Sequence, residues 1–102
     1  MKNKIIAALS QGAKEYYNVS NHNLRDVETL KARGAILWAG TEMGLRPKEI
    51  HEFMNMDQGN ASRLRKKYIA ETPPEEKEGV WIIIKLYLQA TVFCNDFSPL
   101  EY

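Results

Sequence analysis

The sequence predicts an all-α protein, a small helical bundle of 102 residues that contains a helix-turn-helix. Apolar residues recur at helical spacing along most of the chain, and prolines and capping residues divide it into segments of helix length. Residues 47–68 show the pattern of two helices joined by a tight turn. With 44% hydrophobic and 26% charged residues, the chain is long enough for one domain, 1–102, with its own core.

Two long amphipathic helices are expected in the first half of the chain. Residues 2–17 carry apolar side chains at helical spacing, and residues 27–43 do so over the longest central stretch, which Gly44 is placed to end. We expect the second helix to be the central packing helix. Between them, residues 18–23 are rich in turn formers, and Ser20 could cap a short helical piece ending near Arg25. The apolar residues that the second helix offers for burial are Leu30, Ile36, Leu37, Trp38, Ala39 and Met43.

The helix-turn-helix at 47–68 is the stretch around which the rest of the chain is organised. Pro47 suits the first turn of its first helix, where a missing amide hydrogen has no cost. Asn55 falls at the turn, where a residue that tolerates a left-handed backbone is needed. Asp57 is expected to cap the second helix, since its carboxylate can accept from free backbone amides. The small core between the two helices is predicted to consist of Ile50, Met54, Ala61 and Leu64, with Met56 beneath the turn.

An apolar C-terminal extension, residues 72–95, is expected to follow the core at 13–70. Thr72 and Glu75 have the spacing of a capping box with Pro73 at the first helical position. The segment from Trp81 to Cys94 is almost wholly apolar and could be a buried strand, although its length and capping signal favour a helix. It is too short for a membrane span. Such a segment closes the core or makes a homodimer contact, here through Trp81 to Phe93.

Charge is unevenly placed along the chain. Residues 1–70 hold 12 Lys and Arg against 7 Asp and Glu, a net +5, whereas residues 71–102 hold 2 against 6, a net −4, which together give the overall +1. The helix-turn-helix therefore lies on the basic part, as attraction to phosphate requires. A net excess of five positive charges is modest, so it is compatible with DNA binding but does not by itself indicate it.

Enzymatic or metal chemistry has little support in the sequence. His22 and His51 lie on unrelated segments, and no cluster of Cys, His or carboxylate residues has the spacing of a metal site. No cofactor is expected. The lone Cys94 cannot form an internal disulfide, and the apolar run after Met1 is too short for a secretory signal, so a cytoplasmic location is expected.

The order of elements from about Ala13 to Ile69 resembles the C-terminal DNA-binding domain of the bacterial replication initiator DnaA, which has a Trp-repressor-like helix-turn-helix. Residues 15–20 (EYYNVS) resemble that family's E-Y-Y-[NG]-[VI] segment, and Leu24 matches the leucine that follows. Residues 31–38 (KARGAILW) resemble its R-P-R-Q-x-A-M-Y, and 42–43 (EM) its E-L. Residues 47–50 (PKEI) are similar to its L-P-E-I. The resemblance implies this fold and a DNA-binding ancestry.

The chain departs from that family in the motif that reads DNA. Members that read the origin box carry G-G-R-D-H-[ST]-T where this chain has residues 55–61, NMDQGNA. Asp57 replaces the base-reading arginine and Gly59 the histidine, and an aspartate cannot donate to guanine. The family's basic loop is shorter here and carries two acids in residues 25–30, with Lys31 and Arg33 near it. Binding to the initiator's own box is therefore not expected, and without a Walker lysine loop neither is nucleotide binding.

The predicted ligand is double-stranded DNA, with the second helix of the motif in the major groove. Amides can pair with adenine and arginine with guanine, while lysines neutralise phosphate. The candidate contact residues are Gln58, Gly59, Asn60, Ser62 and Arg63 at the start of that helix, Lys66 and Lys67 further along it, Arg46 and Lys48 before it, and Lys31 and Arg33.

Each of these positions also has a simpler interpretation. Polar residues on a helix face are often only solvated, and basic residues near a helix C-terminus suit the helix dipole. Two functions therefore stay open: a DNA-binding module, with a regulatory role, or a protein-interaction module that kept the fold after its DNA-reading residues had changed.

Overall fold

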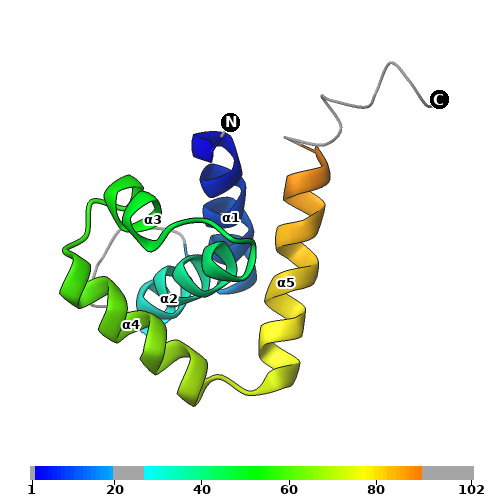
Figure 1. The fold of residues 1–102 in the computed structure, drawn as a ribbon. Coiled ribbons are helices and arrows are strands. Elements are labelled where there is room, and N and C mark those ends of the chain that lie inside the picture. Colours follow the sequence, from blue (N-terminus) through cyan, green and yellow to red (C-terminus); the bar gives the residue numbers. More distant parts are fainter. Residues whose placement is uncertain (1, 20–26, 91–102) are drawn as a thin grey trace.

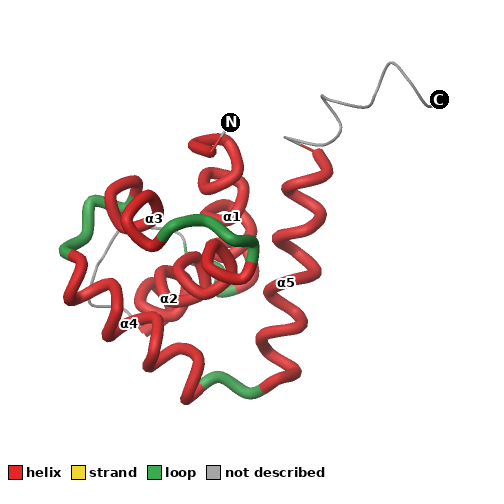
Figure 2. The backbone as a smooth tube through the Cα atoms, viewed as in Figure 1, coloured by secondary structure: helices red, strands yellow, loops and turns green. Residues whose placement is uncertain are grey.

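The computed structural model describes residues 2–19 and 27–90, and this part of the chain is all-helical. Five helices follow one another: α1 (Lys2–Tyr16), α2 (Val27–Glu42), α3 (Pro47–Phe53), α4 (Gln58–Glu71) and α5 (Pro74–Leu88). Figure 2 shows these helices and no strand in the described ranges. The prediction of an all-α bundle is confirmed, and no described helix has the length and apolar character needed to cross a membrane.

The central helix is α2, which contacts each of the other four helices. In Figure 1, α1 and α5 lie side by side on one flank of α2, and α3 and α4 cover the other. Eight of the sixteen α2 residues are buried, so α2 is apolar around much of its circumference, as a fully surrounded helix must be. Gly44 ends this region with φ +88°, a conformation that suits glycine.

Two helix contacts depend on glycine because the backbones approach closely. A Cβ atom added to Gly12 of α1 would lie 2.8 Å from the Cα atom of Ile84 on α5. A Cβ atom added to Gly34 of α2 would lie 2.7 Å from the Cβ atom of Tyr68 on α4. Both distances are shorter than real Cβ contacts allow, so glycine sets the spacing of both helix pairs.

The core joins all five helices. Its fully buried large side chains are Ile6 and Leu9 from α1, Ile50 from α3, and Val80 and Ile84 from α5. The predicted core of the α3–α4 pair is confirmed, since Ile50 and Ala61 are buried while Met54 and Leu64 pack against the core from partly exposed positions. Leu30, one of the α2 residues expected to be available for burial, is 38% exposed.

A chain of buried hydroxyl groups ties the end of α1 to α4 and α5. Tyr17 Oη donates to Glu76 Oε2 at 2.7 Å and lies 2.8 Å from Tyr68 Oη, so the Tyr68 hydroxyl donates to Tyr17. Burial, reinforced by the bond to Glu76, raises the pKa of Tyr17, and burial also raises the pKa of Tyr68. Both tyrosines therefore remain neutral over the ordinary pH range.

The structure places the start of α5 one residue later than the sequence predicted. Thr72 is the C-cap of α4, with its amide donating to Tyr68, and no capping box with Glu75 forms. Pro73 is extended, with φ −64° and ψ 153°, and α5 begins at Pro74. The cause is steric, because a residue that precedes proline is driven out of the helical region. At the other end α5 is helical to Leu88, so the strand alternative is wrong for residues 80–88, whereas 91–95 and the predicted cap at Ser20 lie outside the described residues.

Candidate nucleic-acid interface

The α3–α4 pair is held at a fixed geometry by its turn. Asn55 adopts the left-handed conformation predicted for it, with φ 58°. The amide of Met56 donates to the carbonyl oxygen of His51 at 2.8 Å, and His51 Nδ1 lies 3.0 Å from the carbonyl oxygen of Met56. Since a carbonyl oxygen only accepts, Nδ1 carries the proton in this contact. The turn is thus closed by bonds in both directions.

The N-terminus of α4 is capped as predicted. Asp57 Oδ2 accepts from the amides of Gly59 at 3.1 Å and Asn60 at 3.3 Å. This satisfies two of the amides that a helix start leaves without partners, and the negative charge suits the positive end of the helix dipole. The cap fixes where α4 begins and hence which of its residues point outward.

The exposed face of α4 is basic. Gln58, Asn60, Arg63, Lys66 and Lys67 are exposed, whereas Gly59 and Ser62 are half-buried. Residues 63, 66 and 67 share one side of a helix by their spacing. Three cations therefore project from one side of α4, opposite the side that carries the buried Ala61 and Tyr68.

One polar contact on this face changes what Asn60 can offer a ligand. Arg63 Nη2 donates to Asn60 Oδ1 at 2.6 Å. Arginine has no acceptor, so the amide oxygen must face it and the Asn60 amide nitrogen is left to face outward. The contact uses one of the two lone pairs of that oxygen, so the pair presents more donors than acceptors. In this arrangement Asn60 Oδ1 is shared with Arg63, which weakens the bidentate contact with adenine that the sequence suggested, because that contact needs its oxygen.

A groove runs along one edge of α4 and is hereafter called the α4 groove. It has a volume of about 360 Å³, an apolar floor and a polar rim. A second hollow of about 320 Å³ adjoins it, shares Leu30, Leu64 and Lys67, and adds Lys31 on one wall. Lys31 lies 4.0 Å from Glu76 across this second hollow. The residues that line the α4 groove are Leu30, Met56, Asn60, Arg63, Leu64 and Lys67.

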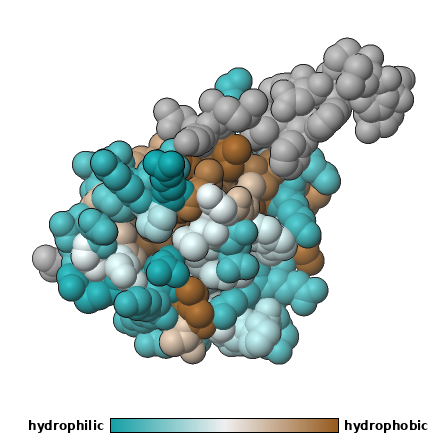
Figure 3. All heavy atoms as spheres, viewed as in Figure 1, coloured by the Kyte–Doolittle hydropathy of each residue, from teal (hydrophilic) through white to brown (hydrophobic). Residues whose placement is uncertain are grey.

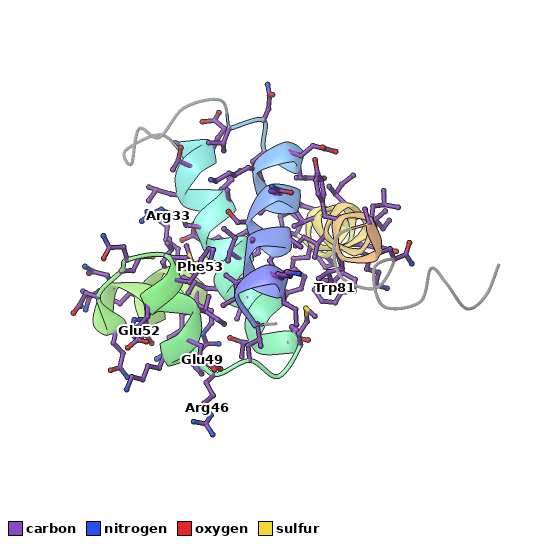
Figure 4. All side chains as sticks on the ribbon, turned by 90° about the horizontal axis from the view of Figure 1, so that it is seen from above. Arg33, Arg46, Glu49, Glu52, Phe53 and Trp81 are labelled. Atoms are coloured by element: carbon purple, nitrogen blue, oxygen red, sulfur yellow. The ribbon has the colours of Figure 1, made fainter. Side chains whose placement is uncertain are left out.

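The structure brings only part of the predicted contact set together. Lys31, Asn60, Arg63 and Lys67 border the two adjoining hollows, and Lys66 lies beside them on α4. Figure 4 shows Arg33 on α2 and Arg46 at the start of α3, on different sides of the α3–α4 pair and pointing in different directions. Among the other candidates, Gln58, Lys48 and Ser62 line neither hollow.

No family model, curated protein or solved structure matches this chain. Within the described residues, no group of three or more His, Cys, Asp or Glu side chains could hold a metal ion.

The sequence did not indicate Leu30, Met56 and Leu64 as residues of the site. Its pattern assigns Met56 and Leu64 to the core of the α3–α4 pair, and Leu30 falls on the apolar pattern of α2, yet Leu30 lines both hollows and is not part of the buried core. Glu71 and Glu76 also line the second hollow, so acids border the cationic surface beyond Lys67. These features follow from where α4 lies across α2, and the sequence pattern carries no information about that crossing.

Proposed function

We propose that this protein binds double-stranded DNA through α4, with the α3–α4 pair acting as a helix-turn-helix of the kind seen in the DnaA C-terminal domain. The observation that carries the proposal is the row of exposed cations at 63, 66 and 67 on a helix whose start is capped and whose angle to α3 is held by a closed turn. A rigid helix of this kind fits the major groove, and its cations reach phosphate. The proposal includes a regulatory role and a cytoplasmic location.

Charge supports a moderate affinity for DNA. The overall net charge is only +1, and Glu71 and Glu76 lie at one end of the surface. Attraction to DNA therefore depends on the local group formed by Lys31, Arg63 and the two lysines that follow on α4. Each phosphate that a cation neutralises contributes about −0.9 to the slope of log K against log salt. We expect binding to be detectable at low salt and to weaken steeply as salt is raised.

Titration of a fluorescently labelled random duplex, followed by anisotropy at low and raised salt, tests the proposal. Reversing two charges with Arg63→Glu and Lys67→Glu is expected to weaken binding by about tenfold or more. Lys4→Glu, an exposed reversal on α1, is the matched control and is expected to have little effect. An affinity too low to measure at low salt, or equal losses in the double variant and the control, would exclude α4 as a DNA-binding surface.

The outward-facing donors of the pair of Asn60 and Arg63 give the proposal a sequence preference. Guanine presents two acceptors, N7 and O6, in the major groove, whereas adenine presents one acceptor and one donor. Selection from random duplexes is expected to enrich guanine at the position that α4 faces, and Asn60→Ala is expected to reduce that enrichment. Enrichment of adenine instead would contradict this preference and show that Asn60 reads the base through its oxygen as well as its amide nitrogen.

A second function, protein interaction, is favoured by the apolar floor of the α4 groove. Leu30, Met56 and Leu64 offer surface that protein side chains fill better than phosphate does. The negative charge of Asp57 at the start of α4 also opposes approach to DNA. If the anisotropy titration detects no binding to duplex DNA at low salt, this second function replaces the first.

A further inference from the structure

We infer that α5 binds a second copy of this chain through its outward face, antiparallel and with a two-fold axis near Ile82. Ile82 and Leu86 are 53% and 56% exposed, although both are large and apolar. They lie four residues apart and so share one face of α5. In Figure 3, brown side chains interrupt the hydrophilic surface along the edge where α5 runs. The inference is independent of DNA binding.

The residues that the sequence suggested for a dimer contact are divided by the structure into two sets. Of the suggested residues 81–93, the structure describes 81–90. Among these, Ile84 and Leu88 are buried against the bundle, and the ring of Trp81 packs on Trp38, with 5.7 Å between ring centroids. Figure 4 shows Trp81 pointing from α5 back toward the bundle. Among the described residues, the opposite side of α5 is the one open to another molecule, and its large apolar side chains are Ile82 and Leu86.

The charged residues that border Ile82 and Leu86 are complementary between two copies of the chain. Glu78 precedes Ile82 by four residues and Lys85 follows it by three, and both side chains are exposed. Seven residues make about two helical turns, so Glu78 and Lys85 lie along the same edge of α5. In an antiparallel pair, equal edges of the two helices meet. Glu78 of each copy then faces Lys85 of the other, and Ile82 packs on Ile82.

The surroundings of Glu78 favour a cation there. Glu78, Glu42, Trp38, Trp81 and Lys77 line an open hollow of about 350 Å³ between α2 and α5. The amine of Lys77 is already engaged, because its Nζ donates to the carbonyl oxygen of Ile69 at 2.8 Å. The Lys85 side chain lies along the Trp81 ring, with Nζ 5.8 Å from its centroid. The side chain can keep its stem on that ring while its charged end reaches Glu78 of the second copy.

Two single charge reversals test the arrangement in the full chain. Glu78→Lys alone brings the introduced lysine against Lys85 of the second copy, and Lys85→Glu alone brings the introduced glutamate against Glu78. Each single variant is therefore expected to dimerise about tenfold or more weakly than the original. An equimolar mixture of the two restores one pair of opposite charges on each side of the axis and is expected to give a heterodimer. The double variant E78K/K85E restores both pairs within a homodimer. Light scattering after size exclusion and native mass spectrometry measure these states.

Ile82→Asp tests the apolar centre of the contact and is expected to give a monomer. Ile69→Asp, at an exposed isoleucine on α4, is the matched control and is expected to leave the dimer intact. Far-ultraviolet circular dichroism reports whether each variant keeps its helices; if Ile82→Asp unfolds, the double variant E78K/K85E decides. A chain that stays monomeric at every concentration, or a dimer that is unchanged by Ile82→Asp, or single reversals that the double variant fails to rescue, would each overturn the inference.

Discussion

The hydroxyl groups of Tyr17 and Tyr68 lie 2.8 Å apart although 51 positions separate the two residues in the chain. The Tyr17 hydroxyl also donates to Glu76, so the end of α1 meets α4 and α5 at one buried oxygen. Buried polar groups that lose a partner are costly, and a bond to a charged acceptor contributes more than one between neutral groups. Removal of the Tyr17 hydroxyl oxygen should therefore lower the free energy of unfolding markedly.

Tyr17→Phe is expected to lower the free energy of unfolding by about 2 kcal/mol, because it removes the hydrogen bonds of the Tyr17 hydroxyl with Glu76 and with the Tyr68 hydroxyl. Urea denaturation of the two proteins at neutral pH measures the difference. The matched control is Tyr16→Phe, since Tyr16 is 38% exposed and its ring packs on Tyr17 at 5.0 Å between centroids. A loss of the same size in both variants would contradict the role given to the hydroxyl chain.

Stability is expected to fall with rising pH in the alkaline range. Burial raises the pKa of Tyr17 and of Tyr68 above the ordinary tyrosine value, so above about pH 10 the unfolded chain loses protons that the folded chain keeps. Where the native state binds more protons, the free energy of unfolding decreases as pH increases. Urea midpoints measured from neutral pH upward should show this decline, and Tyr17→Phe should make it shallower. If the decline of the urea midpoint with pH is unchanged in Tyr17→Phe, the alkaline loss of stability comes from other groups.

Gly12→Ala is expected to destabilise the protein by about 1–3 kcal/mol, because the added methyl group would meet the Ile84 backbone at 2.8 Å. A loss of stability would be informative, since alanine normally stabilises a helix by about 0.5–1 kcal/mol relative to glycine. Gln11→Ala, at the exposed neighbouring position, controls for helix propensity and should be neutral or slightly stabilising. Thermal denaturation compares the two, and a more stable Gly12→Ala variant would show that α1 and α5 can separate without cost.

Asp57→Ala is expected to cost about 1 kcal/mol, because Gly59 and Asn60 lose the acceptor for their amides. Asp57→Asn keeps an acceptor and is expected to stay within about 0.5 kcal/mol of the original. On the proposed function, the same Asn variant should bind duplex DNA more tightly, since a negative charge has been removed from the start of α4. Denaturation and anisotropy on both variants separate the cap from the charge, and an unchanged DNA affinity in Asp57→Asn would place this end of α4 away from phosphate.

Features governed by local chemistry could be predicted from the sequence. The left-handed conformation at Asn55 and the cap at Asp57 depend on a few adjacent residues, and both are confirmed. The start of α5 is also local, yet the capping-box pattern of Thr72 and Glu75 misplaced it by one residue. Two adjacent prolines compete for the first helical position there, and the second one excludes Pro73 from the helix.

Features that depend on how helices cross could not be predicted. The exposure of Leu30 follows from where α4 lies over α2, and the close approach at Gly12 follows from the docking of α5 on α1. The contact of Asn60 with Arg63 requires side-chain positions that residue spacing alone permits without requiring. The candidate site could therefore be assigned to α4 from the sequence, but its groove and the contact between Asn60 and Arg63 could not.

The packing of α5 on α1 also constrains the order in which the protein can fold. Ile6, Leu9 and Ala13 of α1 lie in one buried cluster with Val80, Ile84 and Leu88 of α5. During synthesis, the α5 side of this cluster forms only after residues 80–88 have been made, although α1 can already pack on α2. Contacts between residues so far apart in the chain close slowly, because the intervening segment must first be ordered. The docking of α5 is therefore a late step, and until it occurs the face of α1 that α5 covers stays exposed to solvent.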